Sequence, residues 1–429
     1  MPSQLLLKRE RHRFFNTPAI CTATFFEGSF SLAGSHFKTR FNSVLRSNPW
    51  LAGKIDKSKV EAKLTYSNEP QLNDVFSLLD SPIDISPDTE YELLLKTCST
   101  YSIGTNGSLN GHQLAKLSVP VCRLVVAPTK QVSQFVVLFS ISHAIADGYT
   151  YYEILNMLTD SASVTIRALN PQRKMDFEQL VPKLMSPPVS KFLTSLTFLK
   201  AYLMGFLRKP KAKAMAYFVD ESKVQQAKKR CTTGFVSTND ILTSHFMNAS
   251  APIRLGTMAI NYRPRCSVLD KDDAGNYQDI VLSDIGGYST PEAIRSSLVP
   301  NTEGSFVGLT NPLPGFFSKC PLAFITNVAL KGTDPPFDLS FAKQQLQMPI
   351  LYLGVSIPNF PMDMAMVFRP VPDRLAVLYI AKQSTPDKLL GSTSSVLGDS
   401  VSKSMFPVSD STSQAKRSCA SMKVVPRKD

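Results

Sequence analysis

The stretch LFSISHAIADGYTYYEIL, from Leu138 to Leu155, places one histidine between two different patterns. A run of strand-forming residues ends just before His143, and apolar residues at helical spacing follow Gly148. Asp147 stands four residues after His143, where the helix is expected to begin. The stretch therefore predicts a strand, a short loop and a helix, with a titratable side chain fixed on the loop at the end of a rigid element.

The neighbouring segments predict a mixed α/β protein rather than an alternating βαβ fold. Two β-rich runs around the turn at Ala127–Lys130 form a predicted hairpin whose second arm leads to His143. A second hairpin is expected at 362–381, turning at Pro372 and Asp373. A helix is expected around 35–47, because apolar residues recur there every four positions.

The chain of 429 residues is too long for one ordinary core, so two lobes are expected. We place an N-terminal lobe at 1–165 and a C-terminal lobe at 214–397. A proline-containing crossover at 166–213 joins them, and a loose Ser-rich basic tail is expected at 398–429.

Charge and cysteine usage narrow the class of protein. The 47 basic and 34 acidic residues give a net charge of +13, which favours an anionic partner. The seven cysteines are scattered and form no CxxC pair, which argues against zinc and against a disulfide framework, so we expect no metal. The N-terminus lacks the pattern of a secretory signal, and a cytoplasmic protein is expected.

The segment at 191–213 complicates that expectation, because it is rich in large apolar residues and ends in a basic run. Phe192, Leu196, Leu199 and Leu203 recur at the spacing of an amphipathic helix. Packing of this helix on the protein's own core is the favoured expectation. Contact with a membrane surface is the alternative.

Several kinds of active site lack their sequence patterns: no P-loop, no GxGxxG after a strand and no GxSxG elbow occurs. We expect His12, His36, His112 and His245 to be surface or packing residues. His143 can act as a general base near neutral pH if its ring is neutral and held in one tautomer. Asp147 can face that ring or turn away toward an arginine, and Gly148 would let the backbone turn into the helix.

The motif SHAIADG, with its HxxxDG pattern after a strand, resembles the signature of the CoA-dependent acyltransferase superfamily. This superfamily includes chloramphenicol acetyltransferase, the BAHD enzymes and condensation domains. Softer similarities follow in order: LRSNPWLAGKI near the N-terminus, NYRPR at Asn261–Arg265, and GNY at Gly275–Tyr277. Asp338 remains from an Asp-Phe-Gly-Trp-Gly element whose other residues differ. The resemblance spans residues 15–383 and leaves the branch open.

The resemblance implies two chloramphenicol-acetyltransferase-like lobes, each with mixed sheet and helices, and an active site at their interface. It makes His143 the general base. It gives Asp147 a structural role, paired with Arg263, with Arg265 as second choice. Thr326 and Asn327 are weak candidates for the oxyanion donor, and we expect them to face the core.

The resemblance also implies acyl-CoA as co-substrate and a small-molecule or lipid acceptor, with O- and N-acylation both open. Lys228, Lys229 and Arg230 are candidates for binding its 3′-phosphate, although a solvated helix face explains them equally. Three alternatives stay open: an acidic acyl carrier protein as donor, an ester synthase at a membrane surface, and a non-catalytic binding protein. Nucleic-acid binding is disfavoured because the basic residues are dispersed, and a monomer is expected.

Overall fold

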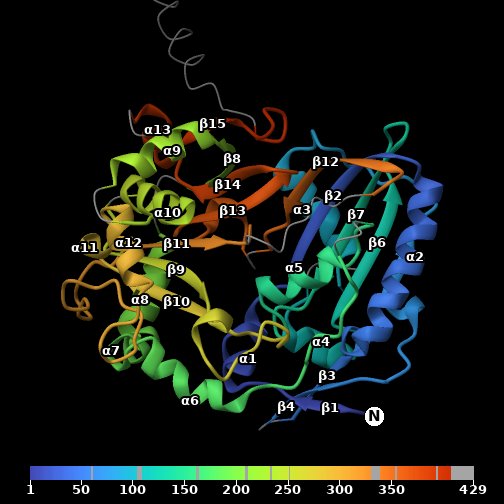
Figure 1. Ribbon diagram of the computed structural model, residues 1–429, viewed down its shortest axis with the longest axis horizontal. Helices are drawn as coiled ribbons and strands as arrows, with labels where there is room; N and C mark the ends of the chain where they lie inside the picture. The colour runs from blue at the N-terminus through green and yellow to red at the C-terminus, as the bar shows by residue number, and fades with distance from the viewer. Residues whose placement is uncertain are drawn as a thin grey trace, which may run out of the picture.

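The structure is a computed structural model. It describes residues 1–58, 61–103, 109–160, 164–207, 211–231, 234–250, 252–329, 339–352, 355–392 and 395–406. Figure 1 shows two lobes side by side, each built around a β-sheet, with the N-terminal lobe mainly in blue and cyan. The predicted α/β class, with mixed sheets in two lobes, is confirmed.

The N-terminal sheet has the strand order β12-β2-β7-β6-β5. Its strands are β2 (Ile20–Gly28), β5 (Phe76–Leu78), β6 (Cys122–Pro128), β7 (Gln134–Ile141) and β12 (Ala342–Pro349). The predicted first hairpin is present: β6 and β7 pair antiparallel, with Cys122 opposite Ile141. β7 therefore ends two residues before His143.

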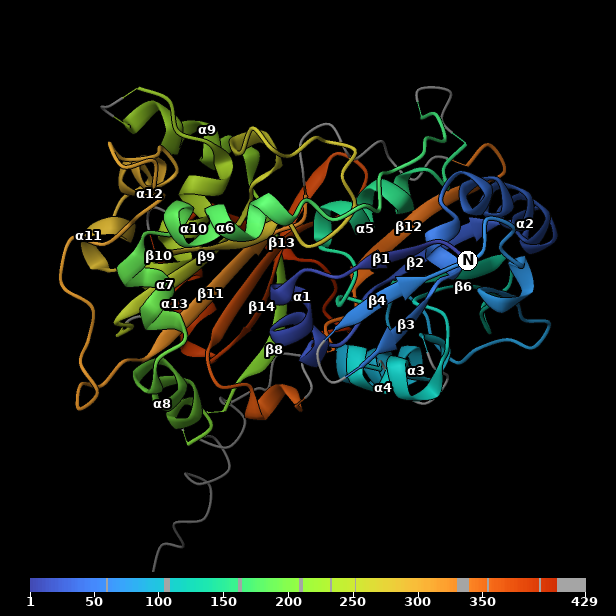
Figure 2. The same cartoon turned by 90° about the horizontal axis from the view of Figure 1, so that it is seen from below.

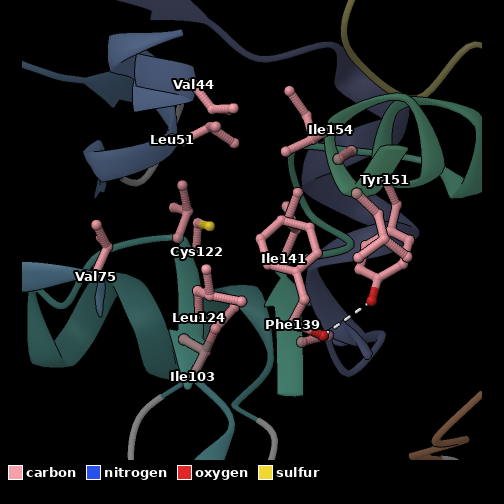
Figure 3. Close-up of a cluster of buried hydrophobic side chains, with 14 of the residues drawn as sticks. Val44, Leu51, Val75, Ile103, Cys122, Leu124, Phe139, Ile141, Tyr151 and Ile154 are labelled. Atoms are coloured by element: carbon pink, nitrogen blue, oxygen red, sulfur yellow. Dashed lines mark hydrogen bonds between the residues drawn. The ribbon is translucent and has the colours of Figure 1, made fainter. Parts of the chain in front are cut away.

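The two faces of this sheet bury different side chains, because successive residues of a strand point to opposite sides. Figure 3 shows one face, where Cys122, Leu124, Phe139 and Ile141 meet helices α2 (Phe30–Ser47) and α5 (Gly148–Asn156). The Tyr151 hydroxyl of α5 donates to the carbonyl of Phe139 at 2.9 Å. This contact fixes α5, and with it the preceding loop, against the sheet.

The opposite face packs on α3 (Tyr91–Tyr101) and on strands of the second lobe. Val125, Val136 and Leu138 share this cluster with Ala216 and Leu378 from the C-terminal sheet. A continuous apolar layer thus joins the two lobes.

The C-terminal sheet has the order β10-β9-β11-β13-β14-β8-β15. Its strands are β8 (Lys213–Val219), β9 (Leu255–Asn261), β10 (Gln278–Ser283), β11 (Leu322–Asn327), β13 (Asp363–Val371), β14 (Arg374–Ala381) and β15 (Leu397–Ser400). β11 runs parallel to both β9 and β13, whereas the other pairs are antiparallel. The predicted second hairpin is β13–β14, and Asp373 in its turn has a φ of 60°.

Helices cover the C-terminal sheet, and a separate small sheet contains the first strand of the chain. The helices are α9 (Glu221–Arg230), α10 (Thr238–Ala249), α11 (Ile285–Tyr288), α12 (Pro291–Ser297) and α13 (Ser384–Gly391). The small sheet joins β1 (Ser3–Leu5), β4 (Ala62–Thr65) and β3 (Lys54–Lys57), near α1 (Lys8–His12) and α4 (Gly111–Leu117). The six cysteines of the described residues are free thiols.

The chain does not divide between the lobes as simply as the predicted ranges suggest. β12 lies within the range assigned to the C-terminal lobe, yet it pairs antiparallel with β2, as Figure 1 shows. β15 pairs with β8, and Phe406 is buried against Tyr91. Folded structure thus continues to Phe406, past the predicted end at 397, and 407–429 lie outside the described residues.

The crossover at 166–213 contains three helices, α6 (Met175–Leu184), α7 (Pro187–Leu193) and α8 (Leu196–Gly205). The helical segment expected at 191–213 is divided between two helices, because α7 ends at Leu193 and Ser195 caps α8 by accepting from the Phe198 amide. Phe192 is buried, and Phe198 and Ala201 of α8 pack against the same cluster, so the helix does pack on the core. Leu196, Leu199 and Leu203, however, are exposed on its other side. Within the described ranges, every helix is too short or too polar to cross a bilayer.

Candidate functional site

A cavity of about 510 Å³ lies between the lobes. The N-terminal lobe contributes His143, Cys21 and Tyr152 to its wall, and the C-terminal lobe contributes Met258 and Phe324. This volume is in the usual range for small-molecule sites. The histidine singled out from the sequence therefore lines a cavity between the two lobes.

The tautomer of His143 follows from its contacts with Asn276. The Asn276 amide nitrogen faces the His143 carbonyl at 2.9 Å and a Glu10 carboxylate oxygen at 3.2 Å, and both of these can only accept. The amide oxygen must then face His143 Nδ1, at 3.2 Å. Because that oxygen also only accepts, Nδ1 carries the proton, and Nε2 of the neutral ring is left as a base.

The surroundings of His143 keep its ring neutral. Burial lowers its pKa below the usual value, and the Asp147 carboxylate and the Asn276 hydrogen bond only partly oppose this effect. The Phe14 ring stacks on the imidazole with centroids 4.8 Å apart and an interplanar angle of 18°. His143 is thus neutral near pH 7 and held between a hydrogen bond and an aromatic face.

Asp147 turns away from the imidazole and caps α5, accepting from the Thr150 amide at 2.9 Å. Its other oxygen accepts from Arg263 Nη1 at 2.8 Å and from the Tyr277 amide at 3.0 Å. Asp147 and Arg263 are both buried. The ion pair that the resemblance implied is present, and it joins the His143 loop to the C-terminal lobe.

Gly275, rather than Gly148, is the glycine that the site needs. Gly275 has a φ of +147°, and a Cβ there would lie 3.1 Å from the Tyr277 ring and 3.3 Å from the Arg173 guanidinium. Its carbonyl accepts from Arg263 Nη2 at 3.0 Å. Gly148 lies in no left-handed region, and an added Cβ would make only an ordinary contact with Val328. The expectation that Gly148 supplies backbone freedom is therefore wrong.

The remaining predicted site residues are dispersed. Arg265 lines the cavity near Arg295, and it binds the Asn261 carbonyl rather than Asp147. Lys228, Lys229 and Arg230 end α9, which contributes none of the described residues that line the cavity. Asp338 lies outside the described residues.

Thr326 and Asn327 line the cavity at the end of β11, which corrects the expectation that they face the core. Asn327 donates to the side chain of Asn239 at 3.0 Å. His12, His36, His112 and His245 are absent from the cavity wall as far as the described residues define it.

Sequence patterns alone missed the support beneath His143. Glu10 and Arg173 form a buried ion pair at 2.9 Å. Arg173 also donates to the carbonyl of Ile145 at 2.8 Å and to that of Ala274 at 3.0 Å. The pair therefore ties α1 to the two loops that carry His143 and Asn276. The GNY motif was the available signal for Asn276.

Replacing Asn276 by alanine is expected to lower the turnover of any reaction that His143 carries by about tenfold, the loss of roughly one good hydrogen bond. The KM for a small acceptor should change little, because Asn276 acts through His143. Asn170→Ala is the matched control, since it removes an amide that binds Asp273 on the adjacent loop. Equal turnover in the Asn276 variant and wild type would contradict this positioning role.

Comparisons with known proteins support the fold alone. No protein-family model and no curated protein matches the sequence. TRI101 of F. graminearum, crystallised with coenzyme A and T-2 mycotoxin, has a TM-score of 0.61 at 13% identity, over 94% of this chain and 100% of that chain. Vinorine synthase has a TM-score of 0.58 at 11% identity, over 94% and 95% of the two chains.

The first condensation domain of the CDA synthetase has a TM-score of 0.52 at 10% identity, over 89% of this chain and 91% of that chain. The architecture of this chain is thus the two-lobed one of these three proteins.

Proposed function

We propose that this protein is an acyltransferase that moves an acyl group from acyl-coenzyme A to a hydroxyl or amine, with His143 as general base. The observation that carries this proposal is the hydrogen bond between His143 and Asn276, at the wall of the cavity between the lobes. It provides a neutral base of fixed tautomer in a space large enough for an acceptor.

In the proposed reaction, His143 Nε2 takes the proton of the acceptor hydroxyl or amine as that group attacks the thioester carbonyl. A bond forms between the acceptor atom and the carbonyl carbon, and the carbonyl oxygen becomes an oxyanion. When the carbon–sulfur bond breaks, the imidazolium returns the proton to the leaving thiolate. No covalent enzyme intermediate is required, so the histidine suffices as the only proton carrier.

The cavity lining suits such substrates. Three guanidinium groups, those of Arg13, Arg265 and Arg295, lie in its wall, and Arg13 and Arg295 pair there with Asp279 and Asp240. Met258, Met364 and Met366 form an apolar part. Guanidinium groups bind phosphates, and methionine side chains suit an acyl chain or an apolar acceptor. TRI101, which shares this fold, was crystallised with coenzyme A and a toxin. These observations support a polyanionic donor and a small apolar acceptor.

The proposal is tested by acceptor-dependent release of thiol. Wild-type protein is incubated with a panel of acyl-CoAs and a panel of alcohols and amines, and parallel reactions contain acylated carrier protein. At least one acyl-CoA should release thiol faster when an acceptor is present. Release from the carrier protein alone would identify it as the donor, and no release from any donor would favour a binding protein on this fold.

Reversing the charges of α9 tests where the donor phosphates bind. The variant K228E/K229E/R230E should raise the KM for acyl-CoA several-fold without lowering turnover, if these residues hold the 3′-phosphate. Lys38, Lys96 and Lys116, which are exposed on helices of the N-terminal lobe, give a control variant with the same change in net charge. An unchanged KM would rule out α9 and favour Arg265 and Arg295.

A further inference from the structure

Helix α8 carries a large exposed apolar surface. Leu196, Leu199, Leu203 and Met204 of the helix are 72%, 50%, 54% and 54% exposed. Leu207, just beyond its end, is 72% exposed, and the loop residues Phe316 and Phe317 are 46% and 93% exposed. We call these seven residues the α8 patch. Single exposed apolar residues are ordinary, but a contiguous group of this size marks an interaction surface.

The seven residues form one surface rather than scattered exposures. Lys200 Nζ donates to the Phe316 carbonyl at 2.8 Å and lies 4.7 Å from the Phe316 ring centroid, which holds the loop against the helix. Leu196, Leu199 and Leu203 follow one another at helical spacing on one face. Figure 2 shows α8 at the outer edge of the C-terminal lobe.

The other side of α8 is fixed to the protein. The Phe198 ring packs edge-on against the buried Phe192 ring at 5.8 Å, and an added Cβ at Gly205 would overlap the Pro361 backbone. A helix that packs on its own core normally presents a polar outer face. α8 is anchored to the protein by one apolar side and exposes a second apolar side. The exposed side is therefore suited to contact with another apolar surface.

The charges of the segment that contains α8 indicate which kind of apolar surface it would contact. No acidic residue occurs from Gln179 to Val219, whereas this segment contains seven basic ones, Lys183, Lys191, Lys200, Arg208, Lys209, Lys211 and Lys213. An apolar face in a segment whose charges are all positive is complementary to an anionic lipid surface, where apolar groups enter the acyl boundary and cations meet the headgroups.

We propose that the α8 patch docks this protein on the surface of an anionic lipid bilayer. Docking here is peripheral and reversible, because the helix lies in the interface and does not cross the bilayer. Pro361, which contacts Gly205 on the anchored side of α8, lies three residues before Met364 of the cavity wall. The docking itself does not depend on the proposed acyl transfer.

The test is flotation of the full-length protein with vesicles of phosphatidylcholine, with and without phosphatidylserine. Wild type should float with the anionic vesicles, and raised salt should weaken the binding. The variant L196Q/L199Q/L203Q should bind them at least tenfold more weakly. Its thiol-release activity toward a water-soluble acceptor should equal that of wild type, which separates a failure of docking from a failure of catalysis.

The matched control is L32Q/L93Q/L117Q, which removes three leucines that are 54%, 51% and 55% exposed on α2, α3 and α4. It should bind vesicles as wild type does, and equal melting temperatures verify that both variants fold. Failure of wild type to float, or equal loss in the control, would overturn the proposal. A wild type that sediments as a dimer, with only the α8 variant sedimenting as a monomer, would also overturn it. The α8 patch would then bind a second copy of this chain.

Discussion

Replacing His143 by alanine is expected to lower acyl-transfer turnover by about 10²- to 10⁴-fold, the usual contribution of a positioned general base. The loss should appear in kcat and leave the KM for acyl-CoA nearly unchanged, because the ring moves a proton rather than holding the donor. Thiol release with the best donor and acceptor pair measures both constants.

The pH dependence of the same reaction gives a second measurement. The base must be unprotonated, so activity is lost as the pH falls through the pKa of His143. Burial lowers that pKa, and the acid limb of the profile should therefore lie below the usual histidine value of about 6.5. His112→Ala, which removes a histidine that contacts Lys57 and not the cavity, is the control and should keep both kcat and the profile. An active His143→Ala enzyme would refute the assignment.

Replacing Arg263 by methionine is expected to lower the free energy of unfolding by about 3–5 kcal/mol, the cost of leaving a buried charge without its partner. Asp147 would lose two hydrogen bonds from the guanidinium, at 2.8 and 3.3 Å, and keep its carboxylate buried. The double variant D147N/R263M should recover part of the loss, because it removes the unpaired charge. Urea unfolding measures all three proteins.

Arg265→Met is the matched control, since Arg265 lies two residues away, is exposed and does not pair with Asp147. A surface substitution of this kind should change stability by about 0.5 kcal/mol or less. Equal destabilisation by the two arginine variants would contradict the role given to the Asp147–Arg263 pair.

The Asp147–Arg263 contribution should also depend on pH. Burial alone would raise the pKa of Asp147, but Arg263 and the Thr150 hydrogen bonds outweigh it and lower the pKa below the usual value. A carboxyl group with a lowered pKa in the folded state stabilises the protein above its unfolded pKa of about 3.9. That stability is lost as pH falls through the folded value, so the difference between wild type and R263M should shrink in acid.

The sequence was informative where neighbours in the chain set the structure. Strand propensity and helical spacing locate β7, α5 and the loop that presents His143, because these depend on local periods. The Asp147–Arg263 pair could be anticipated only through the resemblance, since 116 positions separate the two residues. Glu10 and Asn276 are 266 positions apart and follow no local period, so their meeting beneath His143 could not be predicted.

Helix α8 shows that a local pattern can predict a helix without predicting what its apolar face contacts. The spacing of Leu196, Leu199 and Leu203 gave the apolar face of a helix, but periodicity does not say whether that face meets the core or the surroundings. Ser195 supplied the missing local signal, because its cap breaks the helix and turns α8 away from the line of α7. Strand β12 was missed for a related reason: its partner β2 is some 320 residues away.

Because β12 comes from the second half of the chain, the N-terminal sheet is completed late during synthesis. Strand β2 is synthesised within the first 28 residues, but the strand that pairs with its outer edge spans Ala342–Pro349. Until β12 is made, β2 is an edge strand of the nascent N-terminal sheet, and its unpaired backbone groups can pair with other chains. The outer edge of β2 therefore stays unpaired until the second half of the chain has been made, and chaperones that shield unpaired strands are expected to act during that interval.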